Sequence, residues 1–378
     1  MRCGIITQPL YINYGGILQA YALQTVLNRL GHDAYVVQKK TSNTPLPHGL
    51  RSSLVYGKRF LMRSLGLSDI PVHAEELLNE YRPLISVHTK RFIRKNIQLL
   101  EIDSYQNLKP SDFDAYIVGS DQVWRPAYNK LSETFLQFAD KWNVKRIAYA
   151  ASFGTDEKEY THQQIEFCTP LIHQFNSVSV REKSGVNLCQ DYFGIHAHHV
   201  LDPTLLLRKE DYINLIGNIE GKEVLGNLFV YILDPSKEKL SVVTEIEKTK
   251  HLTSFSVKAK NDYKYAPLAD QIQPPIETWI QGIKDAKLVV TDSFHGCVFS
   301  IIFNKPFILI GNLDRGMARI ESLLELLGLK YRLISNNNNV YDVLDSSINW
   351  KSVNNQLQIW RSLSENYLKE SLVCEVCL

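Results

Sequence analysis

Residues 288–296 read Leu-Val-Val-Thr-Asp-Ser-Phe-His-Gly, and this stretch says more about the fold than any other. The apolar run at 288–290 is typical of a buried strand, and the apolar residues at 297–303 predict a helix directly after a short polar turn. A strand that enters a helix in this way is the unit of a parallel α/β sheet. In such sheets, ligands bind at the carboxyl ends of the strands.

The polar turn between this strand and helix carries the first candidate site residues. Asp292 or Ser293 can cap the helix, whose free N–H groups and positive dipole end favour an anion. His295 follows in the first turn and is placed to contact a phosphate or carboxylate group. A structural interpretation is also open, in which the polar residues are caps and His295 is an ordinary first-turn residue.

The length and composition of the whole chain limit the class of protein to which it can belong. The 378 residues predict two domains, and 44% apolar with 22% charged residues is ordinary for a globular protein. A net charge of +2 excludes a strongly basic nucleic-acid binder. No apolar run approaches the roughly 18 residues that span a bilayer. The first residues predict a strand and no signal peptide, so six cysteines predict reduced thiols in a cytoplasmic protein.

Strand-like and amphipathic segments alternate along most of the chain, which is typical of parallel α/β units. We place a domain boundary between residues 195 and 225. The expected units are an N-terminal domain at 1–205, a second domain at 206–345 and a C-terminal helix within 346–378. Strands are predicted at 3–7, 34–37, 114–118, 146–150, 177–180, 199–201, 228–233, 253–257, 288–290 and 307–310. Helices are predicted at 17–30, 75–93, 237–248, 276–285, 297–303, 318–327 and 353–372.

One region interrupts this alternation. Residues 41–72 contain several prolines and glycines together with Arg51, Lys58, Arg59 and Arg63. This composition predicts an excursion from the core or a mobile flap. Together with the helix predicted after it, the excursion extends from about residue 41 to about residue 95.

Four consecutive predicted strands, from 114–118 to 199–201, are each followed by small, polar or charged residues, which predicts one continuous cleft. After the first of them, Ser120 and Asp121 can hydrogen-bond sugar hydroxyls, and Asp121 can act as a base. A helix cap or Asx turn is the structural alternative. Trp124 suits either a platform for a sugar face or the core. Arg181 ends the third strand, and its guanidinium matches carboxylates and phosphates, although a surface pair with Glu182 is also open.

Two further segments supply candidates. Asn13, Tyr14, Gly15 and Gly16 follow the first strand, where two glycines allow the backbone to approach a ligand or simply form a tight turn. The segment is not GxGxxG, so a dinucleotide site is weakly indicated. Arg315 and Arg319 follow the strand at 307–310 and face the His295 turn if the two strands are neighbours. Solvated surface charge is the alternative.

The CxxC pair at the end of the chain, Cys374 and Cys377, is the remaining motif. A zinc site needs four ligands, and the sequence contains no second CxxC. We therefore predict no metal, although a redox or partner-binding role for the pair stays open.

Taken together, the motifs resemble the polysaccharide pyruvyl transferase family from the first strand to about residue 330. The matching segments lie at residues 13–16 with 18–24, 114–124, 179–182, 201–204 and 291–296. The resemblance implies an α/β fold of two Rossmann-like domains, similar to the glycosyltransferase-B type, with the terminal helix packed back on the first domain. It also implies transfer of the pyruvyl group of phosphoenolpyruvate to two saccharide hydroxyls, which forms a ketal during exopolysaccharide or capsule synthesis and needs no cofactor.

The resemblance also assigns site residues. His295 matches a histidine that assists proton transfer and holds the donor, and Arg181 matches an arginine that binds phosphoenolpyruvate. Better-known members carry an arginine where this chain has Ser293, so Arg315 or Arg319 would have to replace that cation. With Asp121 as the second candidate catalytic residue, the expected donor contacts are Arg181, Ser293, Phe294, Gly296, Arg315 and Arg319. The expected acceptor or cleft residues are Asn13, Tyr14, Gly15, Gly16, Ser120, Trp124 and Asp292.

Two alternatives to pyruvyl transfer remain at this stage. The first is a glycosyltransferase that uses a nucleotide sugar, since a guanidinium and a helix N-terminus serve a diphosphate equally well. The second is a non-catalytic saccharide-binding protein or a redox partner that uses Cys374 and Cys377. Acceptors in such pathways are often lipid-linked, so the basic stretch at 51–63 suggests peripheral contact with the inner face of the membrane.

Overall fold

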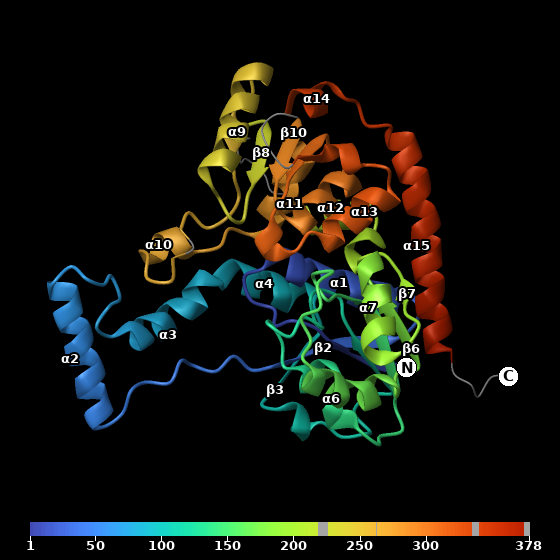
Figure 1. Cartoon of the computed structure of the whole chain (residues 1–378), viewed down its shortest axis with the longest axis horizontal. Helices are drawn as coiled ribbons and strands as arrows, with labels where there is room; N and C mark the ends of the chain where they lie inside the picture. The colour runs from blue at the N-terminus through green and yellow to red at the C-terminus, as the bar shows by residue number, and fades with distance from the viewer. Residues whose placement is uncertain (218–225, 262, 335–339, 374–378) are drawn as a thin grey trace.

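The computed structural model describes residues 1–217, 226–261, 263–334 and 340–373, and within them it contains two parallel β-sheets, one in each half of the molecule (Figure 1). The first sheet has the order β3-β2-β1-β4-β5-β6-β7 and the second the order β12-β11-β10-β8-β9. This confirms the α/β fold class. Cys374 and Cys377 lie outside the described residues.

The strands are short and buried. Those of the first sheet are β1 (Arg2–Ile6), β2 (Asp33–Lys39), β3 (Leu99–Ile102), β4 (Ala115–Val118), β5 (Lys145–Ala151), β6 (Ser177–Val180) and β7 (His198–His199). Those of the second are β8 (Leu228–Tyr231), β9 (Ser254–Phe255), β10 (Leu288–Thr291), β11 (Phe307–Ile310) and β12 (Leu333–Ile334). Every residue of β4, β10 and β11 is buried, as expected where helices cover both faces of a parallel sheet.

The helices include those predicted, except that the one predicted at 75–93 is two helices, and several that the sequence analysis did not predict. They are α1 (Tyr14–Arg29), α2 (Leu50–Ser64), α3 (Ala74–Ile85), α4 (Val87–Asn96), α5 (Leu131–Thr134), α6 (His162–Ile172), α7 (Lys183–Phe193), α8 (Lys209–Ile216), α9 (Lys237–Lys250), α10 (Leu268–Gln271), α11 (Ile276–Asp285), α12 (Phe294–Ile302), α13 (Ala318–Leu326), α14 (Val340–Asp345) and α15 (Trp350–Leu372). None of these helices is long and apolar enough to cross a bilayer.

In both sheets the order in which successive strands are added changes side at a switch point. In the first, β1 lies between β2 and β4, so the strand order turns between β1 and β4. In the second, β8 lies between β9 and β10, so the order turns between β8 and β10. Ligands of open α/β sheets bind outside the carboxyl ends of strands at such points. The chain therefore has two switch points that can contribute to one site.

An apolar interface joins the two halves. Tyr14 at the start of α1 lies against Tyr231 of β8 and Trp279 of α11, with ring centroids 6.4 Å and 5.7 Å away. Its hydroxyl donates a hydrogen bond of 2.7 Å to the carbonyl of Pro274. The interface aligns the ends of the first sheet with those of the second.

The terminal helix α15 runs along both halves and packs on the first sheet (Figure 1). Tyr367 donates to the carbonyl of Ala148 in β5 at 3.0 Å, and the Ser371 and Ser177 hydroxyls are 2.9 Å apart. This confirms the predicted return of the C-terminal helix to the first domain.

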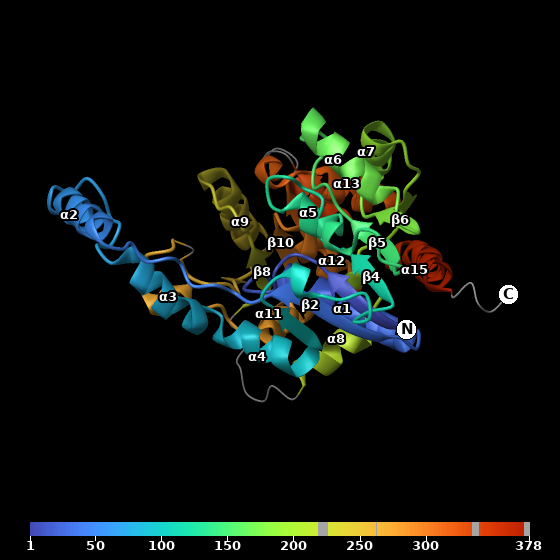
Figure 2. The same cartoon turned by 90° about the horizontal axis from the view of Figure 1, so that it is seen from below.

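The excursion after β2 forms an arm that projects from the body, with α2 at its tip and α3 leading back (Figures 1 and 2). The single helix predicted at 75–93 is wrong, because the chain breaks at Ser86 into α3 and α4. Pro83 lacks an N–H and weakens the last turn of α3, and the Ser86 hydroxyl bonds the carbonyl of Arg82 at 2.9 Å.

Candidate active site

A cavity of about 360 Å³ lies between the two halves, where the two switch points meet. Gln8 follows β1 and Asp121 follows β4 on one side, while Leu233 follows β8 and Ser293 follows β10 on the other. The other lining residues are Ile12, Asn13, Gln122, Tyr128, Tyr231, Lys258, Gln273, Asp292, Phe294, His295, Arg315, Gly316, Arg319 and Ile320.

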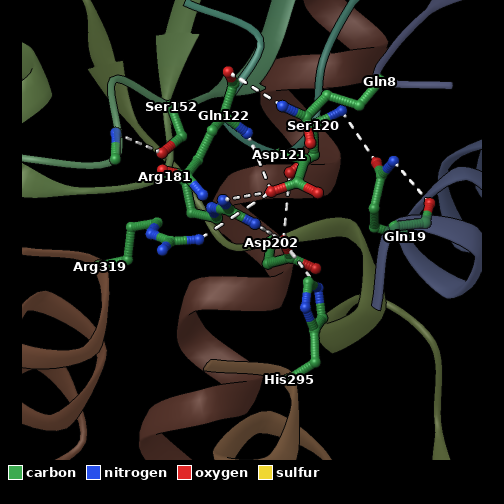
Figure 3. A network of polar contacts seen from close by, with 12 residues as sticks. Gln8, Gln19, Ser120, Asp121, Gln122, Ser152, Arg181, Asp202, His295 and Arg319 are labelled. Carbon is green, nitrogen blue, oxygen red and sulfur yellow. Dashed lines mark hydrogen bonds and ion pairs between the residues drawn. The ribbon is translucent and has the colours of Figure 1, made fainter. Parts of the chain in front are cut away.

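A buried ion network forms the floor of this cleft on the side of the first sheet (Figure 3). Arg181, whose side chain is 1% exposed, donates to Asp202 Oδ2 at 2.6 Å and to Asp121 Oδ1 at 3.3 Å. The Ser120 hydroxyl donates to Asp202 at 3.1 Å. The strand ends that were predicted to share one cleft therefore do meet. Arg181 itself lies beneath the cleft surface, with its charge already balanced, which differs from the expected direct contact with the donor.

Asp121 is aimed into the cleft by its backbone. Its φ of 70° lies in the left-handed region, and its carbonyl accepts from the N–H groups of Val123 and Ser152 at 2.7 Å and 3.1 Å. Burial opposes ionisation, but the charges of Arg181 and the neighbouring cationic groups hold the pKa of Asp121 below its usual range. The carboxylate is therefore ionised and is a weaker base than an ordinary aspartate.

His295 bridges the two halves. It lies in the first turn of α12, and its ring rests on Gly15 at the start of α1, where an added Cβ would stand 2.0 Å from Nδ1. Its Nε2 is 3.9 Å from Asp202 Oδ2 and has no hydrogen-bond partner among the described residues. The N-termini of two helices thus converge at this imidazole, a location that favours an anion.

Burial lowers the pKa of His295 below its ordinary value of about 6.5. Asp202 and Asp121 oppose this change, whereas Arg181 and Arg319 add to it. The imidazole is therefore largely neutral at pH 7 when the cleft is empty.

Arg319, which is 6% exposed, is a buried cation that is incompletely paired. One amino group donates to the carbonyl of Arg315 at 2.8 Å, the other is 4.0 Å from Asp121, and Nε has no partner among the described residues. Burial lowers the pKa of Arg319 to about 10, so the group remains charged at pH 7. A buried guanidinium with unused donors is suited to an anionic ligand.

Arg315 differs from Arg319 because a carboxylate already pairs with its guanidinium group. It binds both carboxylate oxygens of Asp234, and Nη2 lies 3.0 Å from Oδ1. The bond to Arg315 is the main reason that the pKa of Asp234 falls to about 2. β10 and β11 are adjacent, so both arginines face the His295 turn as predicted, but Arg315 is half exposed and its charge is balanced.

The turn before His295 is built as a cap. Ser293 accepts a hydrogen bond of 3.4 Å from the Gly296 N–H, and Asp292 is fixed by Lys239 at 2.8 Å and by the Leu233 N–H at 2.7 Å. Phe294 then places its ring 4.7 Å from the guanidinium of Arg181 and 5.7 Å from that of Arg319. The predicted cap role is confirmed for Ser293. The Phe294 ring makes cation–π contacts with both arginines.

Several residues that were expected to contact ligands do not line the cavity. Trp124 is fully buried in the core, with its ring 5.3 Å from Phe135, so it offers no face to a sugar. Gly296 is needed for packing, since a Cβ there would stand 2.3 Å from Thr291 Oγ1. The others outside the lining are Tyr14, Gly15, Gly16, Ser120 and Arg181.

Sequence reasoning missed two residues that matter at the site. Asp202 joins Arg181 to His295. It follows a predicted strand and lies in the family-like segment 201–204, but it was not named as a site residue. Lys258 lines the cavity and donates to the Ile232 carbonyl at 2.9 Å, and the described residues offer it no ion pair. No motif marks Lys258, because it reaches the site from an irregular segment after β9.

Glu182 is also buried, but on the far side of Arg181. It accepts hydrogen bonds from the Ser152 hydroxyl at 3.0 Å and from the Phe153 N–H at 2.8 Å. Burial raises the pKa of Glu182, although Arg181 and its hydrogen bonds oppose this change. The surface pair of Arg181 with Glu182 that the sequence left open is therefore absent, since both groups are interior and face different partners.

A family model described as polysaccharide pyruvyl transferase matches residues 13–315. The chain belongs to this family. It is a transferase, and its activity is pyruvyl transfer in polysaccharide biosynthesis, which implies a saccharide acceptor. No curated protein shows significant similarity to the sequence.

Solved structures show the fold of this pyruvyl transferase. UGT89C1 of Arabidopsis thaliana, complexed with UDP-L-rhamnose, is 11% identical with a TM-score of 0.53, covering 100% of this chain and 99% of that chain. HepE of Anabaena, in complex with UDP and glucose, is 10% identical with a TM-score of 0.51, covering 98% and 99%. A UDP-GlcNAc 2-epimerase of Neisseria meningitidis is 8% identical with a TM-score of 0.50, also covering 98% and 99%. At these identities the likeness confirms the glycosyltransferase-B-like fold alone.

Proposed function

We propose that the pyruvyl donor is phosphoenolpyruvate and that it binds against His295, Arg319 and Lys258. The observation that carries this proposal is the buried, incompletely paired guanidinium of Arg319 beside the junction of two helix N-termini. A small donor with a phosphate and a carboxylate would use those unused N–H groups. Its size also suits a cavity of about 360 Å³ that must hold an acceptor hydroxyl as well.

Lys258 supplies the charge that Ser293 does not. Its ammonium group bonds the carbonyl of Ile232, one residue beyond the paired residues Tyr231 and Thr291 of β8 and β10. It therefore lies level with the turn that precedes His295. We infer that Lys258 and Arg319 together neutralise the donor, whereas Arg315 contributes less because Asp234 already holds it.

The reaction begins with protonation of the donor's methylene carbon, which makes the adjacent carbon cationic. One saccharide hydroxyl adds to that carbon and loses its proton. The bond between the carbon and the phosphate oxygen then breaks and inorganic phosphate leaves. The second hydroxyl adds in turn and loses its proton, which closes the ketal. One proton is consumed at the methylene carbon and two are released from the hydroxyls, and the phosphate or solvent takes up the balance.

We propose that His295 is the acid for the first step. It is neutral in the empty cleft, and the arriving anionic donor raises its pKa because the opposite charge favours the imidazolium. The proton is therefore acquired together with the donor. Asp121 lies on the opposite side, where its ionised carboxylate orients the attacking hydroxyl and accepts a hydrogen bond from it, with only weak basicity.

Calorimetric titration with phosphoenolpyruvate tests the donor assignment. We expect binding in the unaltered protein and at least about a tenfold loss in Arg319→Met, since a charged hydrogen bond contributes roughly 1.5–3 kcal/mol. Arg94→Met removes an exposed arginine on α4 and is the matched control. Binding of a uridine diphosphate sugar in place of phosphoenolpyruvate would instead support the nucleotide-sugar alternative.

The acceptor is a saccharide, and we propose that it is presented on a lipid carrier at the inner face of the membrane. The basic arm supports this proposal, because it could hold the enzyme at an anionic surface.

A further inference from the structure

The tip of the arm exposes large apolar side chains that nothing in the described residues covers. Leu54, Leu61 and Leu65 are 73%, 59% and 62% exposed, and Phe60 and Leu67 are 65% and 68% exposed. All five lie within residues 54–67, on and just after α2, at the part of the molecule farthest from the body (Figures 1 and 2). Isolated exposed leucines are ordinary, but a contiguous group on a projecting helix marks an interaction surface.

The leucines form one face of the helix and basic residues border it. Leu54, Leu61 and Leu65 are spaced by seven and four residues, which places them on one side at 100° per residue. Arg51 and Lys58 lie within about 60° of the same side by this helical geometry, and both are exposed. We call the surface made of Arg51, Leu54, Lys58, Leu61 and Leu65 the arm face.

Two residues on the other side of α2 contact its own chain. Arg59 binds both oxygens of Glu75 at 2.7 Å, and the Tyr56 hydroxyl lies 3.4 Å from Glu76. These contacts join α2 to α3 and fix which side faces outward. α2 contains no aspartate or glutamate, so its outward side is purely basic and apolar.

We propose that the arm face docks on an anionic lipid bilayer. A helix that combines an apolar stripe with flanking lysine and arginine matches the interface between anionic headgroups and acyl chains. A second copy of this chain is a poorer partner, because two such faces brought together would oppose Arg51 and Lys58 to identical positive charges without an acidic residue of α2 to balance them.

The arm also leads from that surface to the cleft. At the inner end of α3, the carbonyl of Arg82 accepts from the Tyr11 hydroxyl at 3.1 Å, and the carbonyl of Ile85 accepts from the Gln273 N–H at 3.1 Å. Gln273 lines the cavity, and Tyr11 precedes the lining residue Ile12. A bilayer held at α2 would therefore lie on the side of the molecule from which this rim of the cleft is reached. A saccharide attached to a lipid could meet the cleft there.

Vesicle co-sedimentation of the full chain tests the proposal without any donor or acceptor. We expect binding to phosphatidylcholine vesicles that contain phosphatidylglycerol, and much weaker binding to phosphatidylcholine alone. The variant Leu54→Ser/Leu61→Ser should lose about tenfold or more in vesicle affinity, because it removes two inserting side chains. Arg51→Gln and Lys58→Gln should each lose about fivefold, and only on the anionic vesicles.

Matched controls lie on α9 of the second half, where Leu240 is 50% exposed and Lys237 is exposed. Leu240→Ser and Lys237→Gln should leave vesicle binding unchanged. Three results would overturn the proposal: equal binding to both vesicle types, equal losses in the control variants, or a dimer in solution that Leu54→Ser/Leu61→Ser dissociates. Calorimetry with phosphoenolpyruvate on the same variants should be unaltered. A failed membrane proposal can thus be told apart from a failed donor proposal.

Discussion

The buried charges on the two walls of the cleft differ in how closely they are paired. On the side of the first sheet, Arg181 is 1% exposed at its side chain and satisfies both Asp121 and Asp202. On the side of the second sheet, Arg319 and His295 are almost as buried. Nε is unpartnered in both arginines, but the ion pair of Arg319 with Asp121 is 4.0 Å long, and His295 Nε2 has no hydrogen-bond partner in the described structure. The difference teaches that burial alone does not mark a ligand site. Incomplete pairing on the second wall is what points to the donor.

The largest expected effect is on the rate and tests the second wall. His295→Gln keeps a side chain of similar size but removes the acid, so turnover should fall by about 10²–10⁴-fold. The measurement is phosphate release from phosphoenolpyruvate with a saccharide acceptor identified by screening. His162→Gln, at an exposed position of α6, is the control and should retain full activity. A loss of less than tenfold in His295→Gln would remove His295 from this role.

The next effect is on stability and tests the first wall. Arg181→Leu leaves Asp121 and Asp202 buried without their main partner, so the free energy of unfolding should fall by about 3–5 kcal/mol. Arg319→Leu removes only a cation that burial already disfavours, and Asp121 keeps Arg181. It should cost clearly less in the same urea titration. Equal losses would mean that the two walls do not differ in the way described.

A smaller effect concerns the charge that replaces the missing arginine. Lys258→Met should weaken phosphoenolpyruvate binding by about ten- to a hundredfold, because it removes a charged hydrogen-bond donor worth roughly 1.5–3 kcal/mol. Lys260→Met, two residues away and exposed, is the matched control in the same calorimetric titration. Unchanged affinity in Lys258→Met would leave Arg319 as the main cation that binds phosphoenolpyruvate.

The contact between the walls can be tested at Gly15. Gly15→Ala places a Cβ 2.0 Å from His295 Nδ1, so it should destabilise the protein by about 1–3 kcal/mol and displace the imidazole. Gly57→Ala in α2 meets no atom within 4 Å and should be neutral or slightly stabilising. The double variant Gly15→Ala/His295→Ala should recover most of the lost stability in thermal unfolding. Without that recovery, the strain does not arise from the imidazole.

The smallest expected effect is the uptake of less than one proton for each phosphoenolpyruvate molecule bound. The pKa of His295 is lowered in the empty cleft, and a bound anion raises it, so at a pH between these two values donor binding takes up protons. Affinity for phosphoenolpyruvate should consequently weaken as the pH rises through that interval. Calorimetry in buffers of different ionisation enthalpy measures the uptake, and His295→Gln should abolish the histidine contribution. Proton release on binding would contradict the proposed charge of the imidazole.

Much of the framework could be predicted because it rests on local patterns. The apolar runs of β6 and β11 and the periodicity of α11 were placed with the observed bounds. Asp121, Arg181 and His295 were identified because each follows a predicted strand. The break at Ser86 was missed because the helical pattern continues past it, whereas α3 ends at Ile85, two residues after Pro83, and α4 begins at Val87.

The sequence by itself determined that strand ends carry polar groups and that two parallel sheets form, since both follow from short-range periodicity and turn chemistry. Only the tertiary structure decided which polar groups serve each other. Arg181 and Arg319 are the same residue type near similar turns, yet Arg181 pairs with two carboxylates at 2.6 Å and 3.3 Å, whereas the ion pair of Arg319 with Asp121 is 4.0 Å long. That outcome depends on contacts between segments up to two hundred residues apart. Pairing and desolvation are properties of the assembled cleft, and no local pattern encodes them.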